Sequence, residues 1–285
     1  MSNRRRIVSN YFLFPILCIV IYFAIIFLAA TSVAVFVGED YMEHEGKIYF
    51  LEGILGLGVL ITWIMMKKAM GKEIPPMSKG KPVDWIYSVI AALAMLGVAV
   101  IYFKLVEKSD SSFVKKALDE YEELMQTTSS TKVDLYLNVF ATCFMIPIIE
   151  ETIFRGMVME GMLELKHVVA AIVCSSIYFG AMHGQIIQIG YAILAGAMLG
   201  MVYYLTKNLD MSILAHAIFN IMGSGIYLIF SISDQTDKVL SYIECAALLP
   251  FIGMTVYLVK TRKKRFSEME EKTDKLAMAL PEDQV

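Results

Sequence analysis

Eight long apolar stretches constrain the fold of this 285-residue chain more than any other feature of its sequence. A helix needs about 20 apolar residues to cross a bilayer, and most of these stretches approach or exceed that length. The chain is 57% hydrophobic with a mean hydropathy of +0.60, which fits a polytopic membrane protein better than a soluble core. We therefore predict an all-α membrane protein of about eight transmembrane helices. The predicted spans are 10–37, 48–66, 84–105, 133–160, 168–183, 186–206, 210–231 and 239–259.

Lys and Arg residues predict the orientation of these helices. If the N-terminus is cytoplasmic, the inner segments carry roughly twice as many Lys and Arg residues as the outer ones. We therefore expect a multi-pass protein of the cell membrane with both termini in the cytoplasm. The short loops and basic inner segments favour a bacterial inner membrane.

The connecting segments differ in character. The Pro- and Gly-rich stretch 71–82 is interpreted as an inner connector. The outer stretch 106–132 contains apolar residues at helical spacing between 113 and 125, which predicts an amphipathic helix on the membrane surface or capping the bundle. The polar tail after Arg265 is predicted to be disordered.

Charged residues within the apolar stretches point to function. Glu150, Glu151 and Arg155 lie among Ile, Phe, Met and Val, where each charge costs at least ~2.5–3.5 kcal/mol at the bilayer centre. Glu151 and Arg155 share a helix face and can neutralise each other. Glu150 is turned away and is the carboxylate available for chemistry. In contrast, Glu52 and Glu244 lie near the predicted outer ends of their spans and are interpreted as interfacial.

Two histidines and an asparagine are expected near Glu150. The fourth and fifth spans form a hairpin that turns at Lys166–His167, and Glu150 and His183 are each 16 residues from that turn. Equal distances from the turn of an antiparallel hairpin place both residues at one depth. His216 and Asn220 share a face of the seventh span. We expect all four residues to converge on one intramembrane cavity, where polar groups usually serve a function.

Three short motifs carry a family resemblance. EETIFR at 150–155 resembles the EExxxR motif of the CPBP family, which comprises the CAAX-type prenyl endopeptidases and their bacterial relatives, also called Abi proteins. FGAMH at 179–183 is similar to the second motif of that family, FxxxH, and HAIFN at 216–220 to the third, HxxxN. All three occur in the family's order inside predicted spans, so the chain is identified as resembling a bacterial-type member.

The resemblance implies an intramembrane protease and assigns roles to residues. Glu150 would activate water with help from His183, while His216 and Asn220 would support the oxyanion or help to hold a metal. Glu151 and Arg155 would complete the first motif. From spacing alone, Phe179 lies one turn before His183 and is expected to pack against its ring. A metal-dependent mechanism of hydrolysis also fits these residues, because His183, His216 and one glutamate could bind zinc with an open position for water. The sequence lacks HExxH, so both mechanisms remain open.

The same resemblance divides the chain and indicates its partners. The expected substrate is a peptide or a membrane-anchored protein within the lipid bilayer, and no nucleic-acid partner is expected. The predicted parts are an N-terminal three-span region at 1–132, a CPBP/Abi core at 133–231, a last span with a basic end at 232–265, and a polar cytoplasmic tail at 266–285.

Two other functions use the same apolar architecture. A non-catalytic bacteriocin-immunity or scaffold protein would bind a toxin or partner through this fold. A transporter would line a path with the buried charges, but the spans show no repeat symmetry and no pair of broken helices. The intact motifs favour the endopeptidase.

Overall fold

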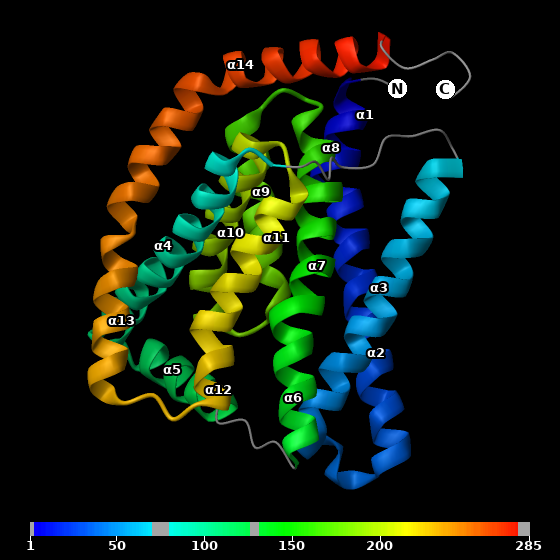
Figure 1. The fold of residues 1–285 in the computed structure, drawn as a ribbon. Coiled ribbons are helices and arrows are strands. Elements are labelled where there is room, and N and C mark those ends of the chain that lie inside the picture. Colours follow the sequence, from blue (N-terminus) through cyan, green and yellow to red (C-terminus); the bar gives the residue numbers. More distant parts are fainter. Residues whose placement is uncertain (1–2, 70–79, 126–130, 279–285) are drawn as a thin grey trace.

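The computed structural model describes residues 3–69, 80–125 and 131–278, and within them the chain is a bundle of long helices (Figure 1). The predicted all-α class is confirmed. The elements are α1 Asn3–Val8, η1 Ser9–Leu13, α2 Phe14–Val37, η2 Glu39–His44, α3 Glu45–Ala69, α4 Pro82–Glu107, α5 Ser112–Met125, α6 Lys132–Phe140, η3 Ala141–Met145, α7 Ile146–Glu151, η4 Thr152–Met159, α8 Glu160–Leu163, α9 Val168–Met182, α10 Ile186–Thr206, α11 Leu209–Asn220, η5 Ile221–Gly225, α12 Ile226–Ile229, α13 Asp234–Ala246 and α14 Leu248–Met278.

Seven helices in the described residues are long and apolar enough to cross a membrane, one fewer than the eight predicted spans. The difference is α9, an apolar helix of 15 residues that ends at Met182. At 1.5 Å per residue, α9 covers only about 22 Å of a hydrocarbon core that is ~30 Å thick. The chain turns at Gly184, whose positive φ of 76° lets the backbone reverse into α10.

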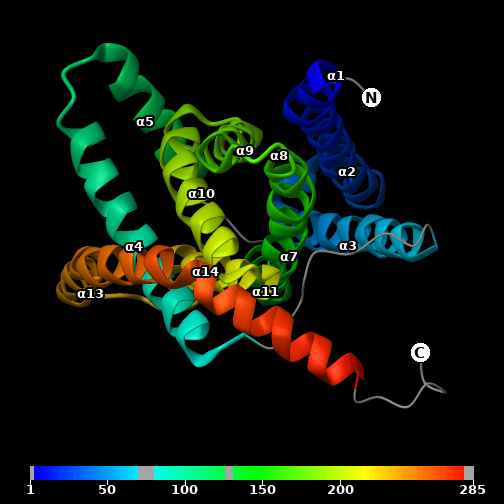
Figure 2. The ribbon, with the colours of Figure 1, turned by 90° about the horizontal axis from the view of Figure 1, so that it is seen from above.

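The central helices of the bundle are covered on two sides. Figure 1 shows the α2–α3 hairpin on one side and α4, α13 and α14 on the other, with α7, α9, α10 and α11 between them. The view from above in Figure 2 gives the same order. Buried apolar side chains fill the space on both sides of the central helices. The three motifs therefore lie on helices that the rest of the chain covers on two sides, while α9 keeps an exposed apolar face that includes Val169 and Val173.

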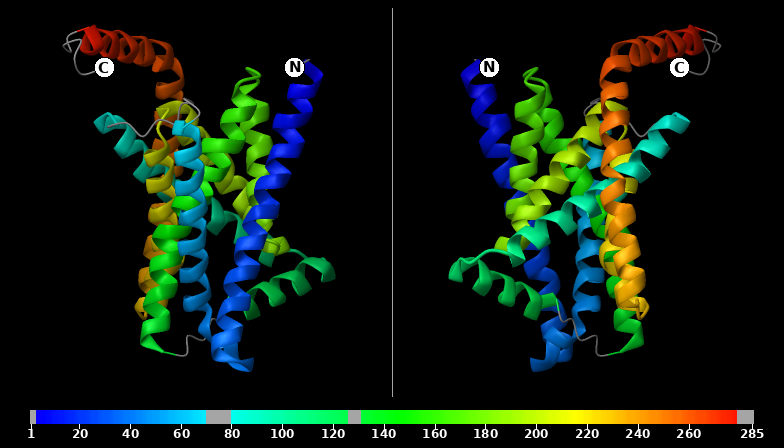
Figure 3. Two further views of the ribbon diagram at one scale, coloured as in Figure 1. Left: turned by 90° about the vertical axis from the view of Figure 1, so that its right-hand side faces the viewer. Right: turned by 90° about the vertical axis from the view of Figure 1, so that its left-hand side faces the viewer.

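Outside the predicted spans, the structure confirms some of the predictions made from the sequence and contradicts one. The amphipathic helix predicted between 113 and 125 is present as α5, which projects sideways from the bundle (Figure 3). Most of the predicted inner connector at 71–82 lies outside the described residues. The prediction of a disordered tail after Arg265 is wrong for residues 266–278, because α14 continues through Met278. This stretch contains no Pro or Gly and is rich in residues that favour helices.

The interpretation that the side chains of Glu52 and Glu244 extend to interfacial water is also wrong. Both residues are buried, with 3% and 6% of their surface exposed. Their burial depends on how α3 and α13 pack against neighbouring helices, and hydropathy along one segment does not contain that information. The first α-helical residue and the last lie at the same end of the bundle (Figure 1), while the cytoplasmic location of that end stays a prediction.

Candidate active site

Glu150 and Glu151 end α7, and Arg155 follows in the wider π-helical turn η4. The ion pair predicted from the spacing is present: Nη1 of Arg155 donates to Oε1 of Glu151 over 2.8 Å. Nη2 of Arg155 donates to the backbone carbonyl of Gly196 on α10, also over 2.8 Å. Neither Glu151 nor Arg155 has any exposed surface, so α7 and α10 are joined by a fully buried, charge-assisted network.

Glu151 also holds two side chains of α11. The Ser212 hydroxyl donates to Oε2 of Glu151, and Nδ1 of His216 lies 2.9 Å from Oε1. Because an ionised carboxylate only accepts hydrogen bonds, this contact places the hydrogen of His216 on Nδ1. Glu151 thus fixes both the tautomer and the direction of the imidazole ring. The spacing of the sequence predicted only the pair with Arg155.

Glu150 faces the other edge of His216. Its Oε2 atom lies 3.6 Å from Nε2 of His216, and only 5% of the residue is exposed. Its Oε1 atom lies 3.4 Å from the Tyr22 hydroxyl on α2. That hydroxyl is 2.6 Å from Oε1 of Glu52 on α3. The carboxylate that was predicted to lack a partner on its own helix therefore has polar neighbours on other helices.

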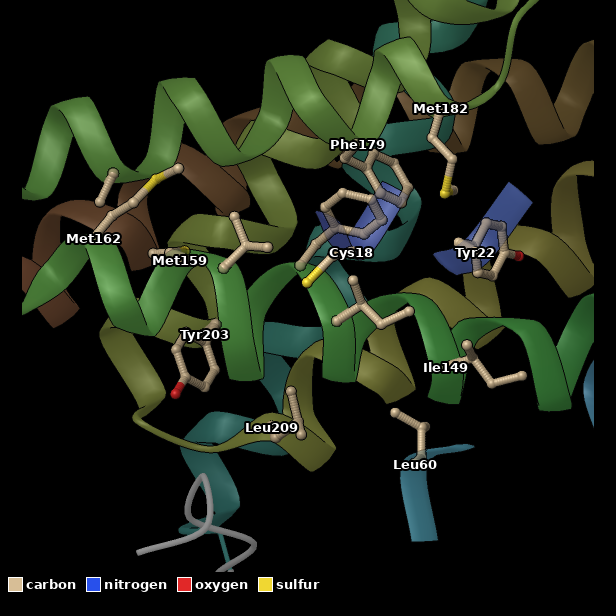
Figure 4. Close-up of a cluster of buried hydrophobic side chains, with 14 of the residues drawn as sticks. Cys18, Tyr22, Leu60, Ile149, Met159, Met162, Phe179, Met182, Tyr203 and Leu209 are labelled. Carbon is tan, nitrogen blue, oxygen red and sulfur yellow. The ribbon is translucent and has the colours of Figure 1, made fainter. Parts of the chain in front are cut away.

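The ring of Phe179 brings the three motifs together. The guanidinium carbon of Arg155 lies 4.6 Å from the centroid of this ring. The ring centroids of His183 and His216 lie 5.0 and 5.7 Å from it, both at steep angles. Figure 4 shows Phe179 in a cluster of buried, mainly apolar side chains that includes Cys18 and Tyr22 of α2. Its predicted packing against His183 is confirmed, and it also packs against Arg155 and His216.

His183 and Asn220 are less closely linked to Glu150 than expected. Nδ1 of His183 lies 2.9 Å from the carbonyl of Phe179, which leaves Nε2 for other partners. Within the described part of the chain, no hydrogen bond or ion pair joins His183 to Glu150. The Asn220 amide donates to the carbonyl of Thr142 over 2.8 Å. An amide nitrogen carries two hydrogens, so Asn220 keeps a second donor.

The zinc site considered from the sequence is not formed by these side chains. Across residues 3–69, 80–125 and 131–278, no group of three or more His, Cys, Asp or Glu side chains is arranged to hold a metal ion. Nδ1 of His216 is engaged by Glu151 and Nδ1 of His183 faces a backbone carbonyl, so either ring could bind a metal only through Nε2.

Tyr22, Glu52 and Ser212 are polar neighbours that sequence reasoning missed. A signal for the first two was available: Tyr22 lies 16 residues before Gly38 and Glu52 lies 14 after it, nearly equal distances from the turn of the α2–α3 hairpin. The equal-depth argument used for Glu150 and His183 applies to them as well. Ser212 lies one turn before His216 and shares its face, but serine in a membrane helix is too common to indicate a site.

The comparison with known families addresses the resemblance directly. Residues 132–222 match the family model described as type II CAAX prenyl endopeptidase Rce1-like. This range contains all three motifs and ends two residues after Asn220. Comparisons with curated proteins and with solved structures gave no match. The predicted resemblance is thus confirmed over residues 132–222, where this multi-pass membrane protein matches the model of the type II CAAX prenyl endopeptidase Rce1-like family.

Proposed function

We propose that the chain is an intramembrane endopeptidase that hydrolyses a peptide bond in a membrane-associated protein or peptide. The observation that carries this proposal is the arrangement of His216 between two buried carboxylates. Glu151 holds the Nδ1 edge of the ring, and Glu150 faces the Nε2 edge from 3.6 Å. Glu150 thus provides a proton acceptor beside an imidazole that Glu151 orients, and peptide hydrolysis needs groups of these two kinds.

Glu150 is the proposed base. A water molecule beside Oε2 of Glu150 would lose a proton to the carboxylate as its oxygen attacks the scissile carbonyl carbon. The carbonyl oxygen then carries the negative charge of the tetrahedral intermediate. The protonated Glu150 returns the proton to the nitrogen of the leaving amine as the C–N bond breaks. One water is consumed, and the base is restored.

His216 and Asn220 are the proposed donors to the oxyanion. Nε2 of His216, when protonated, is stabilised by Glu151 through Nδ1 and points toward the reacting atoms. The second N–H of Asn220 offers another donor, while its contact with Thr142 fixes the amide. Removing one donor of this kind typically costs ~2.7–4 kcal/mol of transition-state stabilisation. His183 is proposed to assist through its Nε2 atom, since its Nδ1 atom is held by the carbonyl of Phe179.

The substrate class follows from the position of these groups. Glu150, Glu151 and His216 are buried on helices that are long enough to cross a membrane, so the scissile bond must reach the site from within or beside the bilayer. A peptide or protein with a membrane anchor meets this requirement. We place the protein in the cell membrane with both termini in the cytoplasm, consistent with the distribution of Lys and Arg.

Hydrolysis in oxygen-18 water tests this function and does not require the substrate to be identified first. The purified protein is incubated with membranes from cells that lack it, and each new carboxyl terminus then carries one heavy oxygen that mass spectrometry detects. Glu150→Gln keeps the shape of the side chain but removes the base, so labelled termini should form about 10²–10⁴ times more slowly. Glu160→Gln is the matched control, because Glu160 follows on the same continuous helix and contacts Tyr203 rather than His216.

The outcome separates an enzyme from an immunity or scaffold protein. An endopeptidase gives labelled termini with the wild type and Glu160→Gln but not with Glu150→Gln. A binding protein gives no labelled termini above the level of membranes alone. Equal labelling by Glu150→Gln and the wild type would refute the role of Glu150 as the base.

A further inference from the structure

Two carboxyl groups from different helices share one tyrosine hydroxyl beside the candidate active site. The Tyr22 hydroxyl lies 2.6 Å from Glu52 and 3.4 Å from Glu150. Tyr22 and Glu52 are each 3% exposed and Glu150 is 5% exposed, so water has almost no access to screen them. A hydroxyl has one hydrogen and can donate to only one of the two carboxyl groups at a time.

The charges around this group do not balance if both carboxyl groups are ionised. Arg155 is bound to Glu151, so it is already neutralised. The remaining basic group in contact with either carboxyl, within the described residues, is His216, which faces Glu150. Even a protonated His216 leaves one carboxylate without a cation, and an unpaired buried charge is far costlier than a protonated acid. One of the two carboxyl groups should therefore carry a proton.

The positions of the partners decide which group is protonated. Glu150 faces the imidazole, which favours its ionised form, whereas Glu52 faces the neutral hydroxyl of Tyr22. A protonated Glu52 donates to the oxygen of Tyr22, and the hydrogen of Tyr22 is then free to point at Glu150. This chain of two hydrogen bonds satisfies all three groups. The mirror-image placement, with the proton on Glu150 and the Tyr22 hydrogen directed at Glu52, satisfies them as well but leaves Glu150 unable to act as a base. The proposed role of Glu150 therefore selects the placement with the proton on Glu52.

We propose that Glu52 and Tyr22 are positioning residues for Glu150, with Glu52 holding a proton that it shares with Glu150 through the Tyr22 hydroxyl. The proposal rests on the proposed function, since it assigns Glu150 the role of base. The Tyr22 hydrogen bond orients Oε1 of Glu150 and leaves Oε2 for the water beside His216. Proton sharing balances: the O–H bond of Glu52 breaks as a new O–H bond forms on Tyr22, whose own proton passes to Glu150.

Substitutions at Glu52 distinguish a neutral acid from a charged one. Gln keeps the shape of the side chain and a donor toward Tyr22, so Glu52→Gln should keep a kcat close to that of the wild type. Glu52→Met fills the same space without a donor and should lower kcat about 10- to 100-fold with KM little changed, as expected when a catalytic group loses its alignment. Tyr22→Phe should resemble Glu52→Met. If Glu52→Gln lowered kcat as much as Glu52→Met, the assignment of Glu52 as a neutral, protonated acid would be wrong.

Matched controls exist on the opposite side of the bundle. Glu244→Met removes another buried glutamate, and Tyr87→Phe removes a buried hydroxyl that lies 2.8 Å from Thr255. Both should leave kcat unchanged after correction for folded protein. Equal losses of kcat in the controls and in the Glu52 and Tyr22 variants would show that general destabilisation causes the effect, and would overturn the positioning role.

Infrared spectroscopy tests the shared proton without any turnover. The wild type at neutral pH should show the carbonyl band of a protonated carboxyl group that is absent from Glu52→Gln, retained in Glu244→Met and shifted in Tyr22→Phe. Retention of the whole band in Glu52→Gln would refute the proposal. If the band were present but no labelled cleavage product formed, the proposed endopeptidase function would be refuted while the protonation of Glu52 would stand. The two failures are therefore distinguishable.

Discussion

Replacing Arg155 with Met should destabilise the protein severely. Arg155 has no exposed surface, and its guanidinium joins Glu151, the carbonyl of Gly196 and the face of Phe179. Removing one partner of a buried ion pair typically costs about 3–5 kcal/mol, because the other charge stays buried without its counterion. A loss of about 4 kcal/mol lowers the folding equilibrium constant almost 10³-fold. This is a large fraction of the roughly 5–15 kcal/mol that stabilises a typical domain.

A second substitution separates the structural role of this ion pair from its role in the site. In Glu151→Gln/Arg155→Met the uncompensated charge is gone, while the amide oxygen of Gln still accepts from Ser212. Stability should therefore recover partly compared with Arg155→Met alone, a coupling that is expected between residues in direct contact. Activity should stay low, because an amide stabilises the imidazolium of His216 far less than a carboxylate does.

Thermal unfolding in detergent, with the fraction of folded protein followed by size-exclusion chromatography, measures both effects. Arg6→Met is the control, since the ion pair of Arg6 with Glu164 is largely exposed and should contribute only about 0–1 kcal/mol. If Arg155→Met were as stable as the wild type, the argument that Arg155 neutralises a buried charge would be refuted. A double variant less stable than Arg155→Met would contradict the charge explanation as well.

Two further outcomes are expected. Gly196→Ala would place a Cβ atom 3.0 Å from the Phe179 ring and 3.4 Å from Nη2 of Arg155. The resulting overpacking should lower stability by about 1–3 kcal/mol in the same unfolding assay. Gly58→Ala is the control, because a Cβ atom there meets nothing within 4 Å. Chelator treatment of an active preparation should leave the rate of oxygen-18 labelling unchanged, because the described side chains form no group able to hold a metal; stoichiometric zinc whose removal abolishes labelling would require a different arrangement of His183 and His216.

The sequence predicted what depends on neighbouring residues along the chain. Apolar runs identified the long helices and the all-α class, because a segment surrounded by lipid must satisfy its backbone hydrogen bonds internally. The four-residue spacing predicted the Glu151–Arg155 pair, since residues at this spacing share a helix face. The three motifs identified the family, which the match over residues 132–222 confirmed. The roles of the motif residues in catalysis stay predictions.

Only the tertiary structure decided which groups surround the motif residues. The contacts of Glu150 with Tyr22, of Glu151 with Ser212 and of Arg155 with Gly196 join residues 128, 61 and 41 positions apart. Such contacts depend on how helices rotate and pack against one another, and hydropathy does not encode that rotation. For the same reason the side chain of Glu52 was expected to reach interfacial water, although it is buried where α3 packs against α2 and α7. Tertiary packing therefore decides how a carboxylate inside the membrane is held, and which group carries its proton.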